Sequence, residues 1–252
     1  MISQKITFKN AQGQDLAARL ELPENGEPKA FALFAHCFTC NKNLTAVRTI
    51  AKTLIEKNIA VMRFDFTGLG ESDGDFEHTN FSSNVQDLHS AAQYLSDNYQ
   101  APKLLIGHSL GGAAVLAASA KIPSVKAIVT IGAPSNPEHV SHLFKSSFDE
   151  INSSGKALVS IGGRDFTIQK QFLEDIQDQN IKHILDEYRS SILIMHSPQD
   201  MTVNIDNAAE IYKAARHPKS FISLNGADHL LSNKKDSAYV GNIIATWADR
   251  YL

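Results

Sequence analysis

Cysteine is scarce in this sequence, and so is any excess of positive charge. The two cysteines, Cys37 and Cys40, are too few for a disulfide framework. The net charge is −3, with acidic and basic residues interspersed along the chain. There is therefore no basic stripe to bind nucleic acid and no polybasic patch to bind a membrane surface. We expect small neutral molecules as partners instead.

Long apolar runs are also absent. No run approaches the ~18 residues that cross a membrane, and residues 1–5 lead into a strand pattern without the apolar core of a signal peptide. We therefore expect a soluble cytoplasmic protein. The 252 residues contain no repeat, low-complexity stretch or linker, so we expect a single domain over residues 1–252.

Short apolar runs are frequent, and their spacing predicts the fold. Apolar and polar residues alternate from 6 to 22 around a turn at 10–13, which predicts an antiparallel hairpin. Near-continuous apolar runs, typical of strands buried on both faces, follow at residues 30–35, 59–64, 104–106, 127–131 and 192–195. Helical patterns occur near residues 47–55, 85–95 and 240–251. With a last strand at 220–224, we predict an α/β fold whose eight-stranded, mostly parallel sheet has helices on both faces.

The segment from 135 to 190 interrupts this alternation, since it is far longer than one helix and its turns need. It contains a strand-like run at 157–161, a Gly162-Gly163 turn and several phenylalanines. An insertion at the C-terminal edge of a parallel sheet is well placed to cover a binding site. We therefore predict a lid insertion over 135–190, after the sixth strand. Surface decoration without a role in binding is the alternative interpretation.

The sequence Gly107-His108-Ser109-Leu110-Gly111 joins a short strand directly to an Ala-rich helix. A serine on such a turn adopts a strained backbone conformation, and the glycines two positions either side remove side chains that would clash. Its hydroxyl group then projects beyond the sheet at a helix N-terminus, where the helix dipole favours negative charge. Ser109 is therefore the predicted nucleophile.

A serine hydroxyl group needs a base to accept its proton and an acid to orient that base. Asp200 follows the strand at 192–195 and His229 follows the strand at 220–224, so both are expected at the same sheet edge as Ser109. The order serine, aspartate, histidine is also the one expected for this architecture. His217 precedes the last strand and belongs at the opposite edge, whereas Asp228 adjoins His229 too closely to hold its ring edge-on.

An oxyanion hole needs two N–H groups near the nucleophile. We expect Leu110, the residue after Ser109, to supply one, and the loop at 36–41 to supply the other. Within that loop Phe38 is the preferred donor and Cys37 the less favoured one. His139 and His142 share a helical face, but no third ligand is evident near them, so no metal site is expected.

These motifs resemble those of the α/β-hydrolase superfamily, and the likeness spans the whole chain. It rests on residues 107–112, on Asp65-Phe66-Thr67-Gly68-Leu69-Gly70-Glu71-Ser72, on Asp200 and on His229. More narrowly, residues 36–40, 74–76, 217–221 and 227–231 resemble the hydrolase half of bifunctional α/β-hydrolase/OsmC proteins. The resemblance implies esterase-type chemistry by the three residues above. Only the hydrolase half is matched, so peroxide reduction is not expected.

Two positions of the oxyanion loop depart from the resemblance. Related esterases usually have glycines where Cys37 and Cys40 stand. A redox-active or metal-binding thiol pair is one interpretation of this Cys-x-x-Cys. Two small buried residues that fill a tight loop are the favoured one.

We hypothesise a serine carboxylic-ester hydrolase that acts on short-chain or aromatic-acid esters through an acyl-enzyme, with no cofactor and no metal. Cys37, His108, Phe144 and Phe166 are expected to line its substrate pocket, His108 as a packing and hydrogen-bonding residue. Thioester or amide hydrolysis and acyl transfer by the same residues are alternatives. A non-catalytic binding protein on the same scaffold is another, since fold does not determine function.

Overall fold

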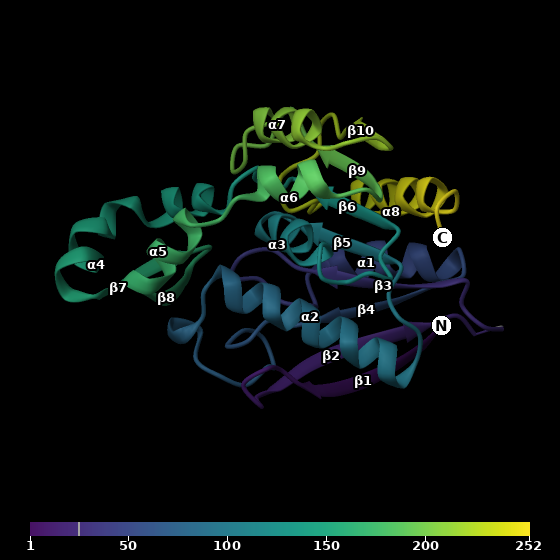
Figure 1. Cartoon of the computed structure of the whole chain (residues 1–252), viewed down its shortest axis with the longest axis horizontal. Coiled ribbons are helices and arrows are strands. Elements are labelled where there is room, and N and C mark those ends of the chain that lie inside the picture. Colours follow the sequence, from purple (N-terminus) through teal and green to yellow (C-terminus); the bar gives the residue numbers. More distant parts are fainter. Residues whose placement is uncertain (25) are drawn as a thin grey trace.

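An eight-stranded sheet forms the centre of the protein (Figure 1). The computed structural model describes residues 1–24 and 26–252. Across the sheet the strands lie in the order β1-β2-β4-β3-β5-β6-β9-β10. Their bounds are β1 (Ile2–Lys9), β2 (Asp15–Leu22), β3 (Ala30–Ala35), β4 (Ile59–Phe64), β5 (Leu104–His108), β6 (Ala127–Ile131), β9 (Ser191–His196) and β10 (Lys219–Ser223).

Most neighbouring strands are parallel. β1 pairs antiparallel with β2, and β2 pairs antiparallel with β4. The remaining five pairs, from β4 across to β10, are all parallel. The predicted N-terminal hairpin and the predicted eight-stranded, mostly parallel sheet are therefore confirmed.

Helices cover both faces of the sheet. α1 (Thr45–Glu56) and α8 (Lys234–Ala248) pack on one face, and α2 (Phe81–Asn98), α3 (Leu110–Ser119) and α7 (Asp206–Ala214) pack on the other. Successive side chains of β3 enter opposite cores, with Leu33 on the α2 and α3 side and Phe34 on the α1 and α8 side. Because both faces are covered, the inner strands are mostly apolar instead of alternating.

The direction of strand addition reverses at β3. From β3 the chain passes through α1 to β4 on one side, and then through α2 to β5 on the other side. Such a reversal leaves a crevice outside the carboxyl ends of the two flanking strands, where ligands bind in sheets of this kind. The loop after β3 and the turn after β5 both begin at this point.

A long insertion separates β6 from β9, and most of it extends away from the sheet (Figure 1). It contains η2 (Pro137–Ser147), α4 (Phe148–Ser154), β7 (Lys156–Ile161), β8 (Arg164–Gln169), α5 (Lys170–Gln177) and α6 (Ile181–Glu187). β7 and β8 form a separate antiparallel hairpin, whose turn residues Gly162 and Gly163 both have positive φ. The strand and the Gly-Gly turn expected there are confirmed. The short helix η1 (Phe76–His78) contacts β8 from the main body.

None of the helices in residues 1–24 and 26–252 combines the length and the apolar character needed to cross a membrane.

Candidate active site

Ser109 occupies a sharp turn between β5 and α3. Its backbone lies at φ 56° and ψ −126°, and its N–H donates to the Ile131 carbonyl at 2.8 Å. A Cβ atom on Gly107 would lie 2.2 Å from the Gly111 carbonyl oxygen, and one on Gly111 would lie 2.3 Å from the carbonyl oxygen of His36. Both glycines are therefore required for the close approach of strand, turn and helix, as the sequence indicated.

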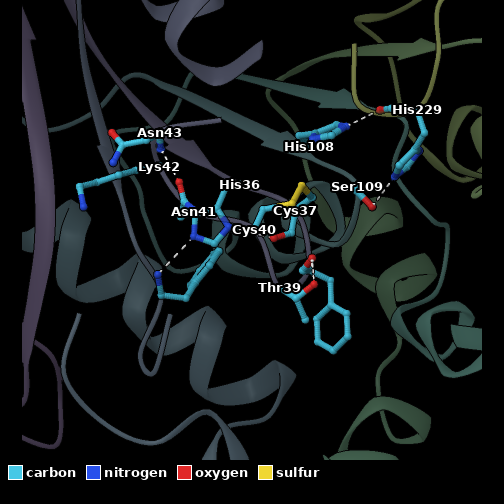
Figure 2. Close-up of a disulfide and its surroundings, with 12 residues drawn as sticks. His36, Cys37, Thr39, Cys40, Asn41, Lys42, Asn43, His108, Ser109 and His229 are labelled. Carbon is cyan, nitrogen blue, oxygen red and sulfur yellow. Dashed lines mark hydrogen bonds between the residues drawn. A yellow bond between two sulfur atoms is a disulfide. The ribbon is translucent and has the colours of Figure 1, made fainter. Parts of the chain in front are cut away.

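His229 connects Ser109 to Asp200. Its Nε2 lies 3.0 Å from Ser109 Oγ, and its Nδ1 lies 2.7 Å from Asp200 Oδ2. Figure 2 shows the imidazole ring of His229 directed at the serine hydroxyl group. The loop after β10 supplies the histidine and the turn after β9 supplies the aspartate. The structure thus brings together the three residues that sequence placement selected, whereas Asp228 accepts the Ser232 N–H within its own turn.

Asp200 is held as an ion by the groups around it. Its Oδ1 accepts the backbone N–H groups of Thr202 and Val203, both at 2.8 Å, and its Oδ2 faces His229. Burial alone would raise the pKa of Asp200, but the hydrogen bonds from His229, Val203 and Thr202 outweigh it and hold the pKa below its ordinary value. The carboxylate is therefore charged and oriented at neutral pH.

His108 contacts the backbone of His229. Its Nε2–H donates to the backbone carbonyl of His229 at 2.7 Å, as Figure 2 shows, and its ring is buried. Burial and the neighbouring His229 lower the pKa of His108 to about 4. The ring is thus a neutral donor, which agrees with the packing and hydrogen-bonding role expected for it.

Gly132 is a site residue that sequence reasoning missed. It follows β6 with φ 55°, and a Cβ atom there would lie 3.2 Å from Asp200 Oδ2 and 3.4 Å from His229 Nδ1. Asp200 and His229 therefore pack directly against the backbone of Gly132, where a side chain would not fit. The sequence signal, a glycine at the carboxyl end of a central strand, was present but is not specific on its own.

The loop after β3 is packed tightly beneath the candidate oxyanion hole. Lys42 is almost completely buried, and its Nζ pairs with Asp65 and with Glu71. Asp65 also accepts the backbone N–H groups of Lys42 and Glu71. His36 Nδ1–H donates to the Cys37 carbonyl at 2.9 Å. These contacts attach the loop to the segment from Asp65 to Glu71.

The N–H groups of Phe38 and Leu110 have no protein acceptor within the described residues. Both residues border the same cavity as Ser109. Unpaired amide N–H groups beside a nucleophile are what an oxyanion hole requires. The structure therefore leaves the two expected donors available to a bound molecule.

Cys37 and Cys40 form a disulfide bond (Figure 2). The favoured expectation, that the two cysteines only fill the loop as small buried residues, is wrong because they are bonded to each other. The turn in which the Cys40 N–H donates to the Cys37 carbonyl brings the two side chains together. The bond encloses Phe38 and Thr39, the latter at φ 58°. The loop that carries the candidate oxyanion donor is thus covalently closed.

A cavity of about 750 Å³ opens above Ser109. Its walls come from the oxyanion loop, from the start of α3, from η2 and from the β7–β8 hairpin. His139 and His142 line it with ring centroids 4.7 Å apart. Among the residues that the structure describes, no group of three or more histidine, cysteine, aspartate or glutamate side chains is arranged to hold a metal ion.

The cavity wall differs from the expected one. Cys37 lines it, but His108, Phe144 and Phe166 do not. His108 is buried behind His229, and Phe144 packs against Phe172 inside the insertion. Phe166 stacks edge-on against Phe76 of η1, with ring centroids 4.9 Å apart. The two phenylalanines stabilise the insertion and its contact with the main body, which is the more common role of aromatic side chains.

Comparisons with known proteins place the chain in a family. The family model described as Serine aminopeptidase, S33 matches residues 26–157, just over half of the chain. The esterase domain of a Rhodothermus marinus protein is 51% identical with a TM-score of 0.83, over 100% of this chain and 99% of that one. The monoglyceride lipase of Rattus norvegicus is 30% identical over 139 residues, which are 53% of this chain and 45% of the lipase.

The structure of Est1E from Butyrivibrio proteoclasticus with ferulic acid bound has a TM-score of 0.83 over 98% of this chain and 99% of that one, at 20% identity, and shows the fold alone. With the eight-stranded sheet and the match to the family model, the chain is an enzyme of the α/β-hydrolase superfamily and belongs to the serine aminopeptidase S33 family.

Proposed function

We propose that this enzyme is a serine carboxylic-ester hydrolase. The observation that supports this most strongly is the continuous hydrogen-bonded chain from Asp200 through His229 to Ser109, at 2.7 and 3.0 Å. A base within this distance of a hydroxyl group can remove its proton as the oxygen attacks. The similarity to the Rhodothermus marinus esterase domain over the whole chain supports the same reaction.

In the proposed reaction, Ser109 Oγ attacks the ester carbonyl carbon while His229 Nε2 accepts the hydroxyl proton. The oxyanion of the tetrahedral intermediate is stabilised by the N–H groups of Phe38 and Leu110. Collapse breaks the bond to the alcohol, which takes the proton from His229 and leaves the acyl group on Ser109. Water then attacks the acyl-enzyme by the same steps and releases the acid. Asp200 stabilises the imidazolium form of His229 throughout.

The cavity favours esters over the substrates of an aminopeptidase. An aminopeptidase must hold the ammonium group of a peptide N-terminus, and carboxylates are the usual partners of a buried ammonium group. None of the described residues that line the cavity is Asp or Glu. The family's printed description therefore does not carry over to the substrate proposed here.

We infer that the insertion at 135–190 acts as a lid. Val140 and Leu143 of η2 and Ile161 of β7 line the cavity together with the oxyanion loop, so the insertion forms one wall of the substrate site. A volume of about 750 Å³ lies within the range of small-molecule sites. The partly apolar wall and this size support short-chain or aromatic-acid esters as substrates.

Hydrolysis of p-nitrophenyl esters, from acetate to long acyl chains, tests the proposal. Wild type is expected to hydrolyse the short esters, and Ser109→Ala is expected to reduce kcat by roughly 10⁴-fold or more, since the nucleophile is lost. Ser119→Ala, on the same helix but outside the cavity, is the matched control and should keep the wild-type kcat.

Two other results would replace the proposal. Labelling of Ser109 by a fluorophosphonate without hydrolysis of any ester would favour thioester or amide hydrolysis or acyl transfer. Absence of both labelling and hydrolysis in a folded protein would favour a non-catalytic binding protein.

A further inference from the structure

The described wall of the cavity carries a positive charge without a negative charge to balance it. Of the described residues in its wall, Arg164 alone carries a permanent charge, and no carboxylate accompanies it. The whole chain, by contrast, has a net charge of −3. The positive charge is therefore a local property of the cavity and does not follow from the composition of the chain.

Arg164 is placed at the tip of the β7–β8 hairpin. It is the first residue of β8 and follows the Gly162-Gly163 turn, so the hairpin carries it to the mouth of the cavity. Its Nη2–H donates to the Thr39 carbonyl of the oxyanion loop, and its guanidinium carbon lies 5.3 Å from the centroid of the Phe166 ring. These two contacts orient the guanidinium group between the insertion and the oxyanion loop.

Most of the hydrogen-bonding capacity of Arg164 is unused. A guanidinium group has five N–H donors, and the described hydrogen bonds use one of them. In the described part of the chain Arg164 forms no ion pair, and the adjacent Asp165 lies at the next position of the strand, where side chains point to the opposite face. The exposed guanidinium group is therefore available to an anion that enters the cavity.

Asn41 is a second side-chain donor in the cavity wall. It lies in the oxyanion loop two residues after Thr39 and also lines the cavity. Its Oδ1 accepts the Asn43 N–H at 2.9 Å, which leaves the Nδ2–H₂ group directed away from that bond. The cavity wall thus offers this amide as a donor in addition to the guanidinium group.

From this arrangement we propose that the enzyme selects esters that carry a carboxylate in addition to the scissile ester group, and that Arg164 is the specificity-determining residue. The planar guanidinium group matches a carboxylate in two parallel hydrogen bonds, which a neutral ester cannot form. Half-esters of short dicarboxylic acids are the substrates of this chemistry. The proposal rests on the ester-hydrolase function proposed above.

The test compares esters that differ in a single charge. Monomethyl glutarate carries one carboxylate, dimethyl glutarate carries none, and methanol release measures the hydrolysis of both. Butyryloxyacetate and its methyl ester form a second pair, in which the charge lies on the alcohol part. Wild type is expected to have a kcat/KM at least about tenfold higher for the charged member of one pair, and the preference should shrink in high salt because the ion pair is screened.

Substitutions then separate selectivity from loop positioning. Arg164→Gln is expected to raise KM for the charged ester about tenfold or more while both parameters for the neutral ester change less than twofold. Arg164→Lys should retain part of the preference. Lys170→Gln, which removes a positive charge from the insertion outside the cavity, should behave as wild type.

Each contrary result has a defined meaning. Equal losses on charged and neutral esters in Arg164→Gln would assign Arg164 to loop positioning and overturn its role in specificity. Equal kcat/KM values in wild type would overturn the proposal and leave the esterase function intact. If no ester is hydrolysed, the test is calorimetric binding of monomethyl glutarate to Ser109→Ala, with and without Arg164→Gln. Binding that is lost with Arg164→Gln supports the anion site. No binding, or binding that does not depend on Arg164, overturns the anion site.

Discussion

At the scale of single residues, Gly132 shows how closely the backbone packs against Asp200 and His229, the proposed catalytic pair. We expect Gly132→Ala to reduce kcat for p-nitrophenyl esters roughly 10- to 100-fold, because the added methyl group would displace Asp200 or His229. Gly13→Ala is the matched control, since Gly13 also has positive φ, 81°, but has no atom within 4 Å of the Cβ position. Both variants should lose about 1–2 kcal/mol of stability from backbone strain, while only the first should lose activity. Equal kcat values in the two variants would contradict this account.

Asp87 provides a second prediction, on pH dependence. Its carboxylate is buried and accepts the N–H and the hydroxyl group of Thr67 at 2.9 and 3.0 Å. Burial raises the pKa of Asp87 to about 6, and the hydrogen bonds from Thr67 offset this only in part. Between pH 4 and 6 the folded state therefore binds more protons than the unfolded state, so this group makes the free energy of unfolding fall as pH rises.

The measurement is the free energy of unfolding of wild type and Asp87→Asn at pH 4, 5 and 6. Relative to the variant, wild type should lose roughly 2 kcal/mol across this window. Asp97→Asn, an exposed position on the same helix, should run parallel to wild type. Parallel curves for Asp87→Asn and wild type would show that Asp87 does not titrate there.

Sequence reasoning located residues whose role depends on local chain geometry. The tight turn at Ser109 and the glycines beside it follow from a strand that runs directly into a helix, and Asp200 and His229 follow from strand ends. Arg164 could not be located in this way, because its place in the cavity depends on how the hairpin packs against the oxyanion loop. Such tertiary contacts between distant segments leave no periodic pattern in the sequence.

At the scale of elements, the oxyanion loop is expected to depend on its disulfide. The double variant Cys37→Ser/Cys40→Ser should lose about 2 kcal/mol of stability, the chain-entropy value for so short a loop. It should also show a kcat about tenfold lower, because the Phe38 N–H is no longer held in place. Complete loss of an oxyanion donor lowers kcat by about 10²–10³-fold, and a donor that is only displaced should cost less.

Reductant provides the control for this prediction. Wild type treated with reductant should fall to the activity of the double variant, while the variant itself should be insensitive to the treatment. Unchanged activity of the reduced wild-type enzyme would show that the loop is held by its other contacts alone, such as the buried pair of Lys42 and Asp65.

The elements differed in how well the sequence predicted them. β7, with the sequence KALVSI, alternates clearly in burial and was expected, whereas β8, with the sequence RDFTIQ, has too few apolar residues to be recognised. β8 is a strand because it pairs with β7 across the Gly162-Gly163 turn and packs against η1. Its conformation is thus determined by its neighbours more than by its own residues.

At the scale of the whole molecule, the proposed catalytic residues lie at one edge of the sheet, apart from the core that stabilises the fold. Ser109, Asp200 and His229 stand on connections that leave three parallel strands at one edge, and the core beneath them is mostly apolar. Composition predicted a neutral partner from the balanced charges of the whole chain. The cavity departs from that average because a single arginine from the insertion determines its charge.

The insertion begins after β6 and ends before β9, and these two strands are direct neighbours in the sheet. A segment whose two ends lie side by side can be exchanged for another of different length without altering the pairing of any strand in the main sheet. Under the roles proposed above, replacing this crossover would change the selectivity and leave Ser109, Asp200 and His229 in place.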